Sequence, residues 1–244
     1  MKVLAIETAT IEVAVAVADE SGLLATVTAR PGRRQVETLH PMIAEACRLA
    51  RITLADLDGI AVDVGPGLFT GLRVGVAAAK ALGGALGLAV VSATSLEVLR
   101  AALPPGIAVV IPVVDMRRGE VAWLMPGRPA ALPRVGSPDE LAAEISIEFG
   151  AGPAPALPGP SRSILLVGDG ALRFQGLLAS CLVPEPIFAG TELAAPPVGS
   201  LAVLALSAMN AGRVADPAAV RPLYGREADA RINWSSRQGR ATVS

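Results

Sequence analysis

The first hundred residues alternate short apolar runs with amphipathic stretches. Residues 3–9 form an apolar run, Val recurs at alternate positions within 12–18, and a third run at 23–29 follows the polar turn 19–22. Alternation with a period of two is typical of half-buried strands, so this opening predicts three antiparallel strands. The remaining pattern predicts a helix, a strand, a helix, a strand and a helix, at residues 35–50, 59–64, 70–86, 89–92 and 94–102. The order βββαβαβα is that of a ribonuclease-H-like lobe.

A similar pattern begins again after Pro104-Pro105-Gly106. Residues 107–115 form an apolar run that ends in Asp115, and residues 120–125 form a second apolar run. This repeats the opening of the chain, where the run that carries Glu7 is followed by a second strand. A capping box that starts at Ser137 then predicts a helix to about residue 149. Further along, a strand is expected at 164–167 and a helix at 200–211.

These two halves predict an α/β protein made of two tandem ribonuclease-H-like lobes, of which the second is reduced. The first lobe is expected at residues 1–103 and the second at 104–229. Pro, Gly and Ala dominate residues 151–163, which favours a flexible insertion, and residues 230–244 form a polar tail.

The composition limits the classes of function. The 244 residues are 52% hydrophobic, which is enough for a real core, but only 3% aromatic, which disfavours base-stacking platforms. Lys and Arg total 21 against 22 for Asp and Glu, so the basic excess of a self-sufficient nucleic-acid binder is absent. Cys47 and Cys181 are not in CxxC pairs and indicate reduced thiols. No signal peptide or membrane span is expected, because Glu7, Lys80 and Pro196 interrupt the apolar runs; we expect a cytoplasmic protein.

The most specific motif is a glycine-rich turn between a predicted strand and a predicted helix. Its residues are Gly65, Pro66, Gly67, Phe69, Thr70, Gly71 and Arg73, with Leu68 between them. Backbone amides at a helix N-terminus can bind phosphate, but the spacing is neither a dinucleotide fingerprint nor a phosphate loop. A structural turn is therefore favoured over a phosphate site, with Thr70 as the N-cap of the helix.

This motif resembles the signature of the TsaB (YeaZ) family and of its paralogue, the TsaD-type catalytic subunit. Further matches to the family lie at residues 4–10, 37–41, 79–82, 115–121 and 222–224. Leu68 departs from the family, in which a Ser is usual. The resemblance implies the two-lobed fold of the actin, sugar-kinase and chaperone ATPases, and a part in threonylcarbamoylation of the adenosine 3′ of the tRNA anticodon.

The two helices of the first lobe carry a possible partner interface. In the second helix Gly71, Gly75, Ala79 and Gly83 recur at every fourth residue and form a ridge of small side chains, which we call the small-residue ridge. The first helix offers the stripe Val36, Leu39, Ile43 and Cys47. These residues either pack within the lobe or contact another helix. The resemblance implies a helical bundle with TsaD, or with a second copy of the chain, and favours an interface.

Catalytic chemistry is poorly represented. His40 is the only histidine, so neither the paired-His metal site of the catalytic paralogue nor an HExxH peptidase site can be built. Actin-like ATPases hold phosphate and magnesium at an Asp-x-Gly turn in each lobe, whereas this chain has Glu7-Thr8-Ala9 and Asp115-Met116-Arg117. Glu7, Thr8 and Asp115 are at most a vestigial nucleotide site, and no catalytic residue, metal or cofactor is expected.

The favoured hypothesis is a non-catalytic scaffold that binds and activates TsaD. The resemblance implies a TsaE-type ATPase as a further partner, contact with tRNA only through the complex, and a homodimer when TsaD is absent. The alternative is an ATP-binding enzyme of the actin and sugar-kinase superfamily. A metallopeptidase is the least favoured.

Overall fold

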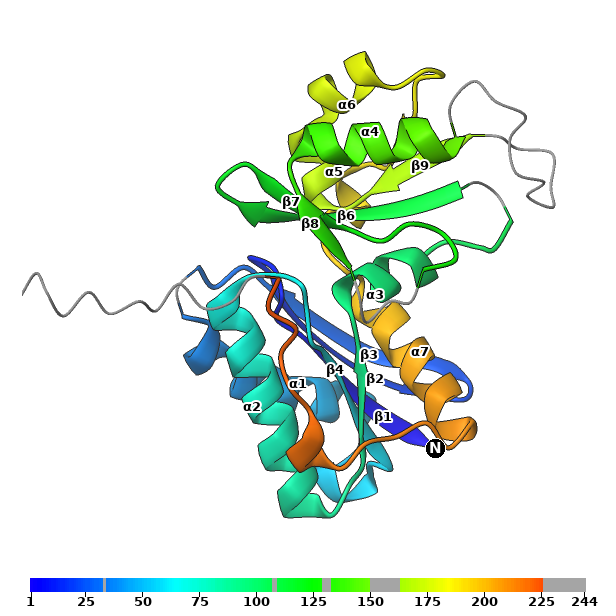
Figure 1. Cartoon of the computed structure of the whole chain (residues 1–244). Coiled ribbons are helices and arrows are strands. Elements are labelled where there is room, and N and C mark those ends of the chain that lie inside the picture. The colour runs from blue at the N-terminus through cyan, green and yellow to red at the C-terminus, as the bar shows by residue number, and fades with distance from the viewer. Residues whose placement is uncertain (33, 107–108, 129–132, 150–162, 226–244) are drawn as a thin grey trace, which may run out of the picture.

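The computed structural model describes residues 1–32, 34–106, 109–128, 133–149 and 163–225, and in this part the chain forms two stacked lobes (Figure 1). The sheet of the first lobe has the order β3-β2-β1-β4-β5. The first three strands are antiparallel, whereas β4 lies parallel to β1 and β5 parallel to β4. Its strands are β1 (Lys2–Glu7), β2 (Val13–Asp19), β3 (Gly22–Ala29), β4 (Gly59–Asp63) and β5 (Val90–Ala93).

Helices cover both faces of this sheet because its strands are apolar on both sides. Along β1, Leu4 and Ile6 face a core that includes side chains of α1 (Gln35–Ala50) and α2 (Phe69–Leu86). Val3 and Ala5 face the opposite core, which includes side chains of α3 (Ser95–Ala101) and α7 (Val198–Asn210). A short 3-10 turn, η1 (Leu54–Asp56), leads from α1 into β4.

The second lobe repeats the strand order of the first. Its order β8-β7-β6-β9-β10 corresponds strand for strand to β3-β2-β1-β4-β5, with β6 in the place of β1 and β9 in the place of β4. The elements are β6 (Val109–Arg117), β7 (Glu120–Trp123), β8 (Arg134–Gly136), α4 (Pro138–Phe149), β9 (Ile164–Val167), α5 (Asp169–Arg173), α6 (Gln175–Cys181) and β10 (Ile187–Phe188). The predicted pair of tandem ribonuclease-H-like lobes is therefore confirmed. The second lobe is smaller, with shorter outer strands and its own core around Trp123.

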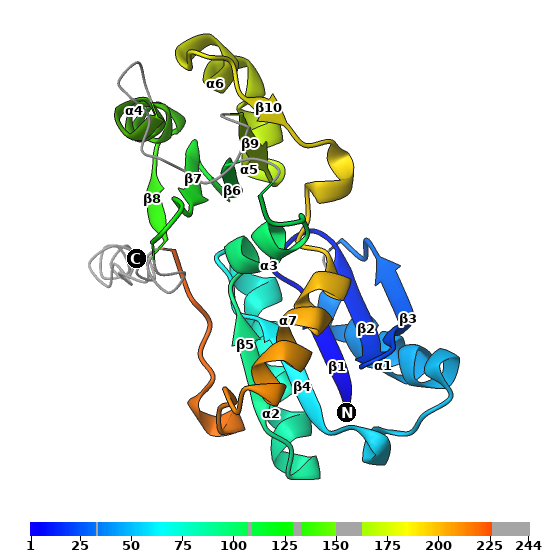
Figure 2. The same cartoon turned by 90° about the vertical axis from the view of Figure 1, so that its right-hand side faces the viewer.

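The end of the described chain returns to the first lobe (Figures 1 and 2). After η2 (Thr191–Leu193), α7 packs on β1 and β2, and residues 211–225, which include η3 (Pro217–Ala219), run back along α2. We call residues 211–225 the C-terminal strap. The range 104–229 expected for the second lobe is thus corrected: α7 packs on the first sheet, and residues 211–223 run along the first lobe.

Most predicted elements appear with their expected bounds to within a few residues. The prediction missed α5, α6, β8 and β10, which are short and lack clear periodicity. The expected insertion at 151–163, apart from Ser163, and the expected tail at 230–244 lie outside the described residues. In the described part of the chain no helix has the length and apolar character needed to cross a membrane.

Candidate functional site

The glycine-rich turn is filled by the chain's own backbone. The turn after β1, Thr8-Ala9, lies directly against it. A Cβ atom at Gly67 would collide with the carbonyl oxygen of Ala9, and one at Gly71 with the carbonyl oxygen of Thr8. The glycines therefore permit close packing between two segments of the lobe, as the structural-turn interpretation predicts.

Thr70 is not the N-cap of α2, so that prediction is wrong. The helix begins at Phe69, and its N-cap is Leu68, which has no side-chain capping bond. Leu68 is fixed instead through its backbone, because its N–H donates to the carbonyl of Ala9 at 2.6 Å. This bond starts the helix one residue before the only hydroxyl of the turn and leaves Thr70 exposed at the second position.

The small-residue ridge faces the interior of its own lobe. Gly71, Gly75, Ala79 and Gly83 are all buried. A Cβ at Gly75 would collide with Thr8 Oγ1, and one at Gly83 would come within 2.8 Å of Pro217 Cγ. The prediction that this ridge is open to a partner helix is therefore wrong, since β1, its turn and the C-terminal strap cover it.

The stripe on α1 is divided between core and solvent. Leu39, Ile43 and Cys47 are buried in the core shared with β1 and β2, so they too are not available to a partner. Val36 is 60% exposed and remains available. His40 lies exposed on the same helix.

Two carboxyl groups meet at the end of the first sheet. The parallel register pairs Ile6 with Val62, so Glu7 and Asp63, each the next residue along its strand, lie side by side on one face. Both are fully buried, and each carboxyl group is close enough to affect the pKa of the other. Glu7 Oε1 accepts the N–H of Ala9 at 2.7 Å, while Asp63 Oδ1 accepts the N–H of Gly65 at 2.7 Å and the hydroxyl of Ser95 at 2.9 Å.

A single proton can satisfy this pair. Among the described residues the other oxygens, Glu7 Oε2 and Asp63 Oδ2, have no hydrogen-bond partner, and a proton on one carboxyl group would let it donate to the other. Burial, followed by the charge of Asp63, raises the pKa of Glu7 well above its usual value. Burial also raises the pKa of Asp63, although its bonds to Gly65 and Ser95 oppose that effect. We therefore assign the proton to Glu7.

The second lobe has two acids at the equivalent strand ends, Asp115 near the end of β6 and Asp169 just after β9. Asp115 Oδ2 accepts hydrogen bonds from Arg117 Nη1 at 2.9 Å and Arg173 Nη1 at 2.6 Å. Asp169 Oδ1 accepts the N–H of Asp115 at 2.8 Å, and burial raises the pKa of Asp169. Two guanidinium groups thus neutralise the carboxylate that an actin-like nucleotide site would leave free.

The turn that follows β9 packs closely against β6. Gly168 has a φ of +106°, and a Cβ there would collide with the carbonyl oxygen of Val113. Asp169 begins α5 and belongs to that helix. These positions again indicate close packing between neighbouring strand ends.

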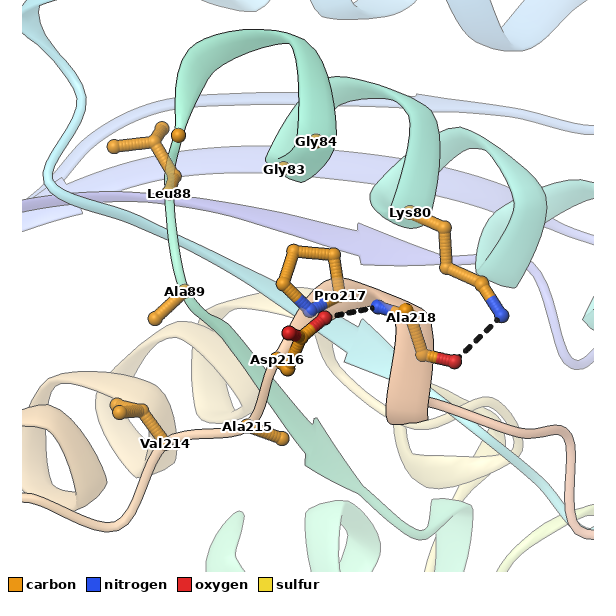
Figure 3. A pocket seen from close by; sticks show the side chains of 11 residues that line it. Lys80, Gly83, Gly84, Leu88, Ala89, Val214, Ala215, Asp216, Pro217 and Ala218 are labelled. Atoms are coloured by element: carbon orange, nitrogen blue, oxygen red, sulfur yellow. Dashed lines mark hydrogen bonds between the residues drawn. The ribbon is translucent and has the colours of Figure 1, made fainter.

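Two hollows could admit a ligand. One, of about 510 Å³, lies beside the carboxyl pair; Glu7, Glu12 and Glu192 contribute to its walls, and none of the described residues that line it is Lys or Arg. The other, of about 660 Å³, lies where the C-terminal strap crosses the end of α2 (Figure 3). Its lysine, Lys80, already donates to the carbonyls of Ala218 and Val220, and Asp216 accepts the N–H of Ala218. Neither hollow combines a nucleophile, a base and an anion-binding group.

Phe69 and Arg73 of the glycine-rich motif point outward from the first turns of α2. There they meet Tyr224 of the C-terminal strap. The motif therefore has two sides: its glycines pack inward on the β1 turn, and two of its side chains lie on the surface.

Sequence reasoning missed Asp63, Ser95, Asp169 and Tyr224 as parts of this region. A signal for Asp63 was present, because it ends an apolar strand as Glu7 does, and parallel strands bring their carboxyl ends to one edge. Nothing in the local sequence relates Tyr224 to Arg73, 151 residues away. Within the described ranges no group of three or more His, Cys, Asp and Glu side chains is arranged to hold a metal ion.

Comparison with known proteins places the motif in one family. A model described as TsaD, tRNA N6-adenosine threonylcarbamoyltransferase, matches residues 22–151. The TsaB tRNA threonylcarbamoyladenosine biosynthesis protein of Escherichia coli is 33% identical over 125 residues, which cover 50% of this chain and 54% of that protein. An uncharacterised protein of Mycobacterium leprae is 38% identical over 145 residues, 57% of this chain and 40% of that protein. The matched regions thus span about half the length of these curated relatives.

A solved structure agrees over nearly the whole chain. The crystal structure of an uncharacterised Pseudomonas aeruginosa protein, described as similar to peptidase YeaZ, has a TM-score of 0.72 and 26% sequence identity. The alignment covers 92% of this chain and 99% of that one. The two-lobed arrangement described above is therefore found in a solved protein with recognisable sequence similarity.

Proposed function

Because the chain belongs to the tRNA N6-adenosine threonylcarbamoyltransferase (TsaD) family, and within it to the TsaB (YeaZ) group, we propose that it is a non-catalytic subunit in threonylcarbamoylation of tRNA. It binds a TsaD-type catalytic subunit and holds that subunit in its active form. The modified base is the adenosine 3′ of the anticodon. The chain itself contributes no catalytic residue, metal or cofactor.

One observation carries the non-catalytic assignment: the acids at both strand ends are already used inside the fold. Glu7 is buried beside Asp63 and accepts the N–H of Ala9, and Asp115 is paired with two arginines. A magnesium-phosphate site needs free carboxylates and room for phosphate at these turns. The glycine-rich turn offers no such room, because Thr8-Ala9 occupies it.

The contact surface for TsaD is the outer side of α1 and α2, which we call the outer helix face. It replaces the buried small-residue ridge. Its apolar side chains are exposed although the chain has a large apolar core. Exposed apolar side chains gathered on one surface are typical of an interaction site. They are Val36, Pro41, Ala44, Leu49, Phe69, Ala77 and Ala81.

The remaining partners are those that the family resemblance implies. A second copy of the chain uses the outer helix face when TsaD is absent, and a TsaE-type ATPase joins the assembled pair. The net charge of −1 supports contact with tRNA through the complex rather than by this chain alone.

The alternative functions lack support in the same residues. An ATP-dependent enzyme of the actin and sugar-kinase type would place phosphates in the hollow beside Glu7, which three glutamates and no lysine or arginine line. A metallopeptidase would need a second histidine, and the sequence has only His40.

Reconstitution tests this proposal. The chain, a TsaD-type subunit and their mixture are each supplied with tRNA, threonylcarbamoyl-adenylate and ATP, and the modified adenosine and the phosphate released from ATP are measured. We expect product from the mixture well above that from TsaD alone, and neither product nor ATP turnover from the chain alone. Robust turnover by the chain alone that Glu7→Ala or Asp115→Ala abolishes would refute the scaffold assignment.

A further inference from the structure

Arg73, Phe69 and Tyr224 form a layered group at the start of α2, which we call the guanidinium cluster. Phe69 and Arg73 are four residues apart on the helix, so they share one side of it. The guanidinium carbon of Arg73 lies 3.8 Å from the centroid of the Phe69 ring. Arg73 Nε donates to the hydroxyl of Tyr224 at 3.1 Å, and the two rings are 5.0 Å apart at 38°. The plane of the guanidinium is thus fixed by one ring and one hydroxyl group.

The C-terminal strap holds Tyr224 in this position. The N–H of Leu223 donates to the carbonyl of Val64 at 2.6 Å, and Lys80 Nζ donates to the carbonyls of Ala218 and Val220. Beyond Tyr224, a Cβ at Gly225 would collide with Met116 of the second lobe. The strap is therefore bonded to the first lobe just before Tyr224 and lies close to the second lobe just after it, and the guanidinium cluster is formed by the chain itself.

This ordered group is nevertheless left open. Phe69 is 45% exposed and Tyr224 is 38% exposed, and Arg73 is exposed as well. Arg73 makes its one hydrogen bond within the described residues through Nε, and its terminal nitrogens have no acceptor there. The Arg73 side chain, held in one geometry, has already lost rotamer freedom. The N–H groups of its terminal nitrogens lie in one fixed plane and match the two oxygens of a carboxylate.

We infer that the guanidinium cluster receives one carboxylate of the TsaD-type partner at the edge of the outer helix face. The inference rests on the proposed function, because it assigns the partner chemistry of that same surface. Phe69 and Tyr224 supply the exposed aromatic surface that is typical of the energetic centre of an interface.

The surrounding charges favour a single carboxylate over the phosphates of RNA. A phosphate backbone is held by several cations at once. In the described part of α2 and the strap, the other cations already have partners: Lys80 binds two carbonyls of the strap, and Arg221 Nη1 donates to the carbonyls of Ala218 and Val220. One open guanidinium with an aromatic support fits one acidic side chain or a chain terminus.

The test compares three variants in calorimetric titrations of the full chain with a TsaD-type subunit, at low and high salt. Arg73→Gln should weaken binding about 10-fold to 100-fold, the usual range for a charge-assisted bidentate bond at an interface. Arg73→Lys should lose most of the same affinity, because lysine keeps the charge but neither the fork nor the stacking. Arg213→Gln is the matched control, since it removes one exposed arginine on the loop after α7, and it should change affinity less than about twofold.

Tyr224→Phe isolates the positioning bond. It keeps the ring beside Phe69 and removes only the hydroxyl that accepts from Arg73 Nε, so we expect an affinity loss of about threefold to tenfold. Melting curves of all variants without partner should stay close to that of the unmodified chain, because the group is exposed.

The outcomes separate the two proposals. If the unmodified chain does not bind the subunit, the proposed function fails, and this inference fails with it. If it binds and Arg73→Gln binds equally well, only the guanidinium cluster is excluded from the interface. If Arg73→Lys binds as tightly as arginine, a simple positive charge suffices and the carboxylate fork is wrong. If Arg73→Gln keeps the subunit affinity but weakens binding of tRNA to the complex, the ligand is phosphate.

Discussion

Glu7 and Asp115 occupy equivalent strand ends, yet the two lobes neutralise them differently. In the first lobe Glu7 is next to another acid with no basic side chain bonded to either, so a proton satisfies the pair. In the second lobe Arg117 and Arg173 compensate Asp115 directly. Both solutions remove a free carboxylate from the edge where related folds bind nucleotide. The raised pKa of Glu7 makes folding depend on pH.

Glu7→Gln should stabilise the protein above about pH 6. Because the pKa of Glu7 is raised, the folded chain keeps a proton that the unfolded chain loses above the ordinary pKa of glutamate. The free energy of unfolding therefore falls as pH rises, by about 1.4 kcal/mol per pH unit. This fall ends where Glu7 also ionises in the folded state. A glutamine keeps the acceptor for Ala9 and offers an N–H to Asp63 at every pH. At pH 8 we expect a gain of about 1 to 3 kcal/mol in the free energy of unfolding, measured by urea titration.

The matched control is Glu185→Gln, which changes an exposed glutamate on a loop and should leave the pH profile unaltered. A residual slope should remain in Glu7→Gln, because burial also raises the pKa of Asp169. Glu12 and Glu97 are the other acids that raise the pKa values of the pair, and both persist in the variant. An unchanged slope between pH 5 and 8 would mean that Glu7 is ionised in the folded chain.

The helix α2 shows where pattern reading succeeds and where it stops. Its bounds were predicted to within one residue, because the apolar periodicity and the glycine that ends it are local features. The direction in which its small residues point was not predictable, since a ridge of glycines suits any close neighbour. Here the neighbour is the chain's own Thr8-Ala9 turn, and the outward side carries Arg73 and Ala77.

Two substitutions on this helix should separate folding from association. Gly75→Ala puts a methyl group into Thr8 Oγ1, whose hydroxyl donates to the carbonyl of Gly71 at 2.8 Å, so the free energy of unfolding should fall by about 1 to 3 kcal/mol. Ala77→Leu adds bulk on the exposed side and should change stability by less than about 0.5 kcal/mol.

The same two proteins are then titrated with a TsaD-type subunit. Ala77→Leu should weaken association although its melting curve is unchanged, whereas folded Gly75→Ala should bind normally. If Gly75→Ala were fully stable and yet impaired in binding, the small-residue ridge would be the interface after all.

At the scale of the whole molecule, the repeated strand–acid–strand pattern was enough to predict two similar lobes. The pattern could not show that the chain returns to the first lobe after the second lobe is complete. Val198 to Asn210 is apolar on several sides, and nothing local indicates whether such a helix covers the nearer sheet or the more distant one. The first sheet decides this, because its second face, with Val3, Ala5 and Ala61, would otherwise be exposed. The second lobe is therefore inserted between two parts of the first.

This arrangement predicts that residues 1–103 do not fold alone, although they contain all five strands of the first sheet. They lack α7, whose Val198, Leu201 and Leu206 are buried against β1 and β2. Burying three such side chains contributes about 5 to 9 kcal/mol, which is comparable to the net stability of a whole domain. They also lack the strap, whose Ala215 exchanges two backbone hydrogen bonds with Val90 and whose Val220 lies in the other core.

The measurement is urea unfolding, followed by circular dichroism, of residues 1–103 and of the same fragment joined through a flexible linker to residues 196–225. We expect a cooperative transition only for the joined protein. A cooperative transition of similar midpoint in residues 1–103 alone would mean that α7 and the strap merely cover a lobe that is already complete.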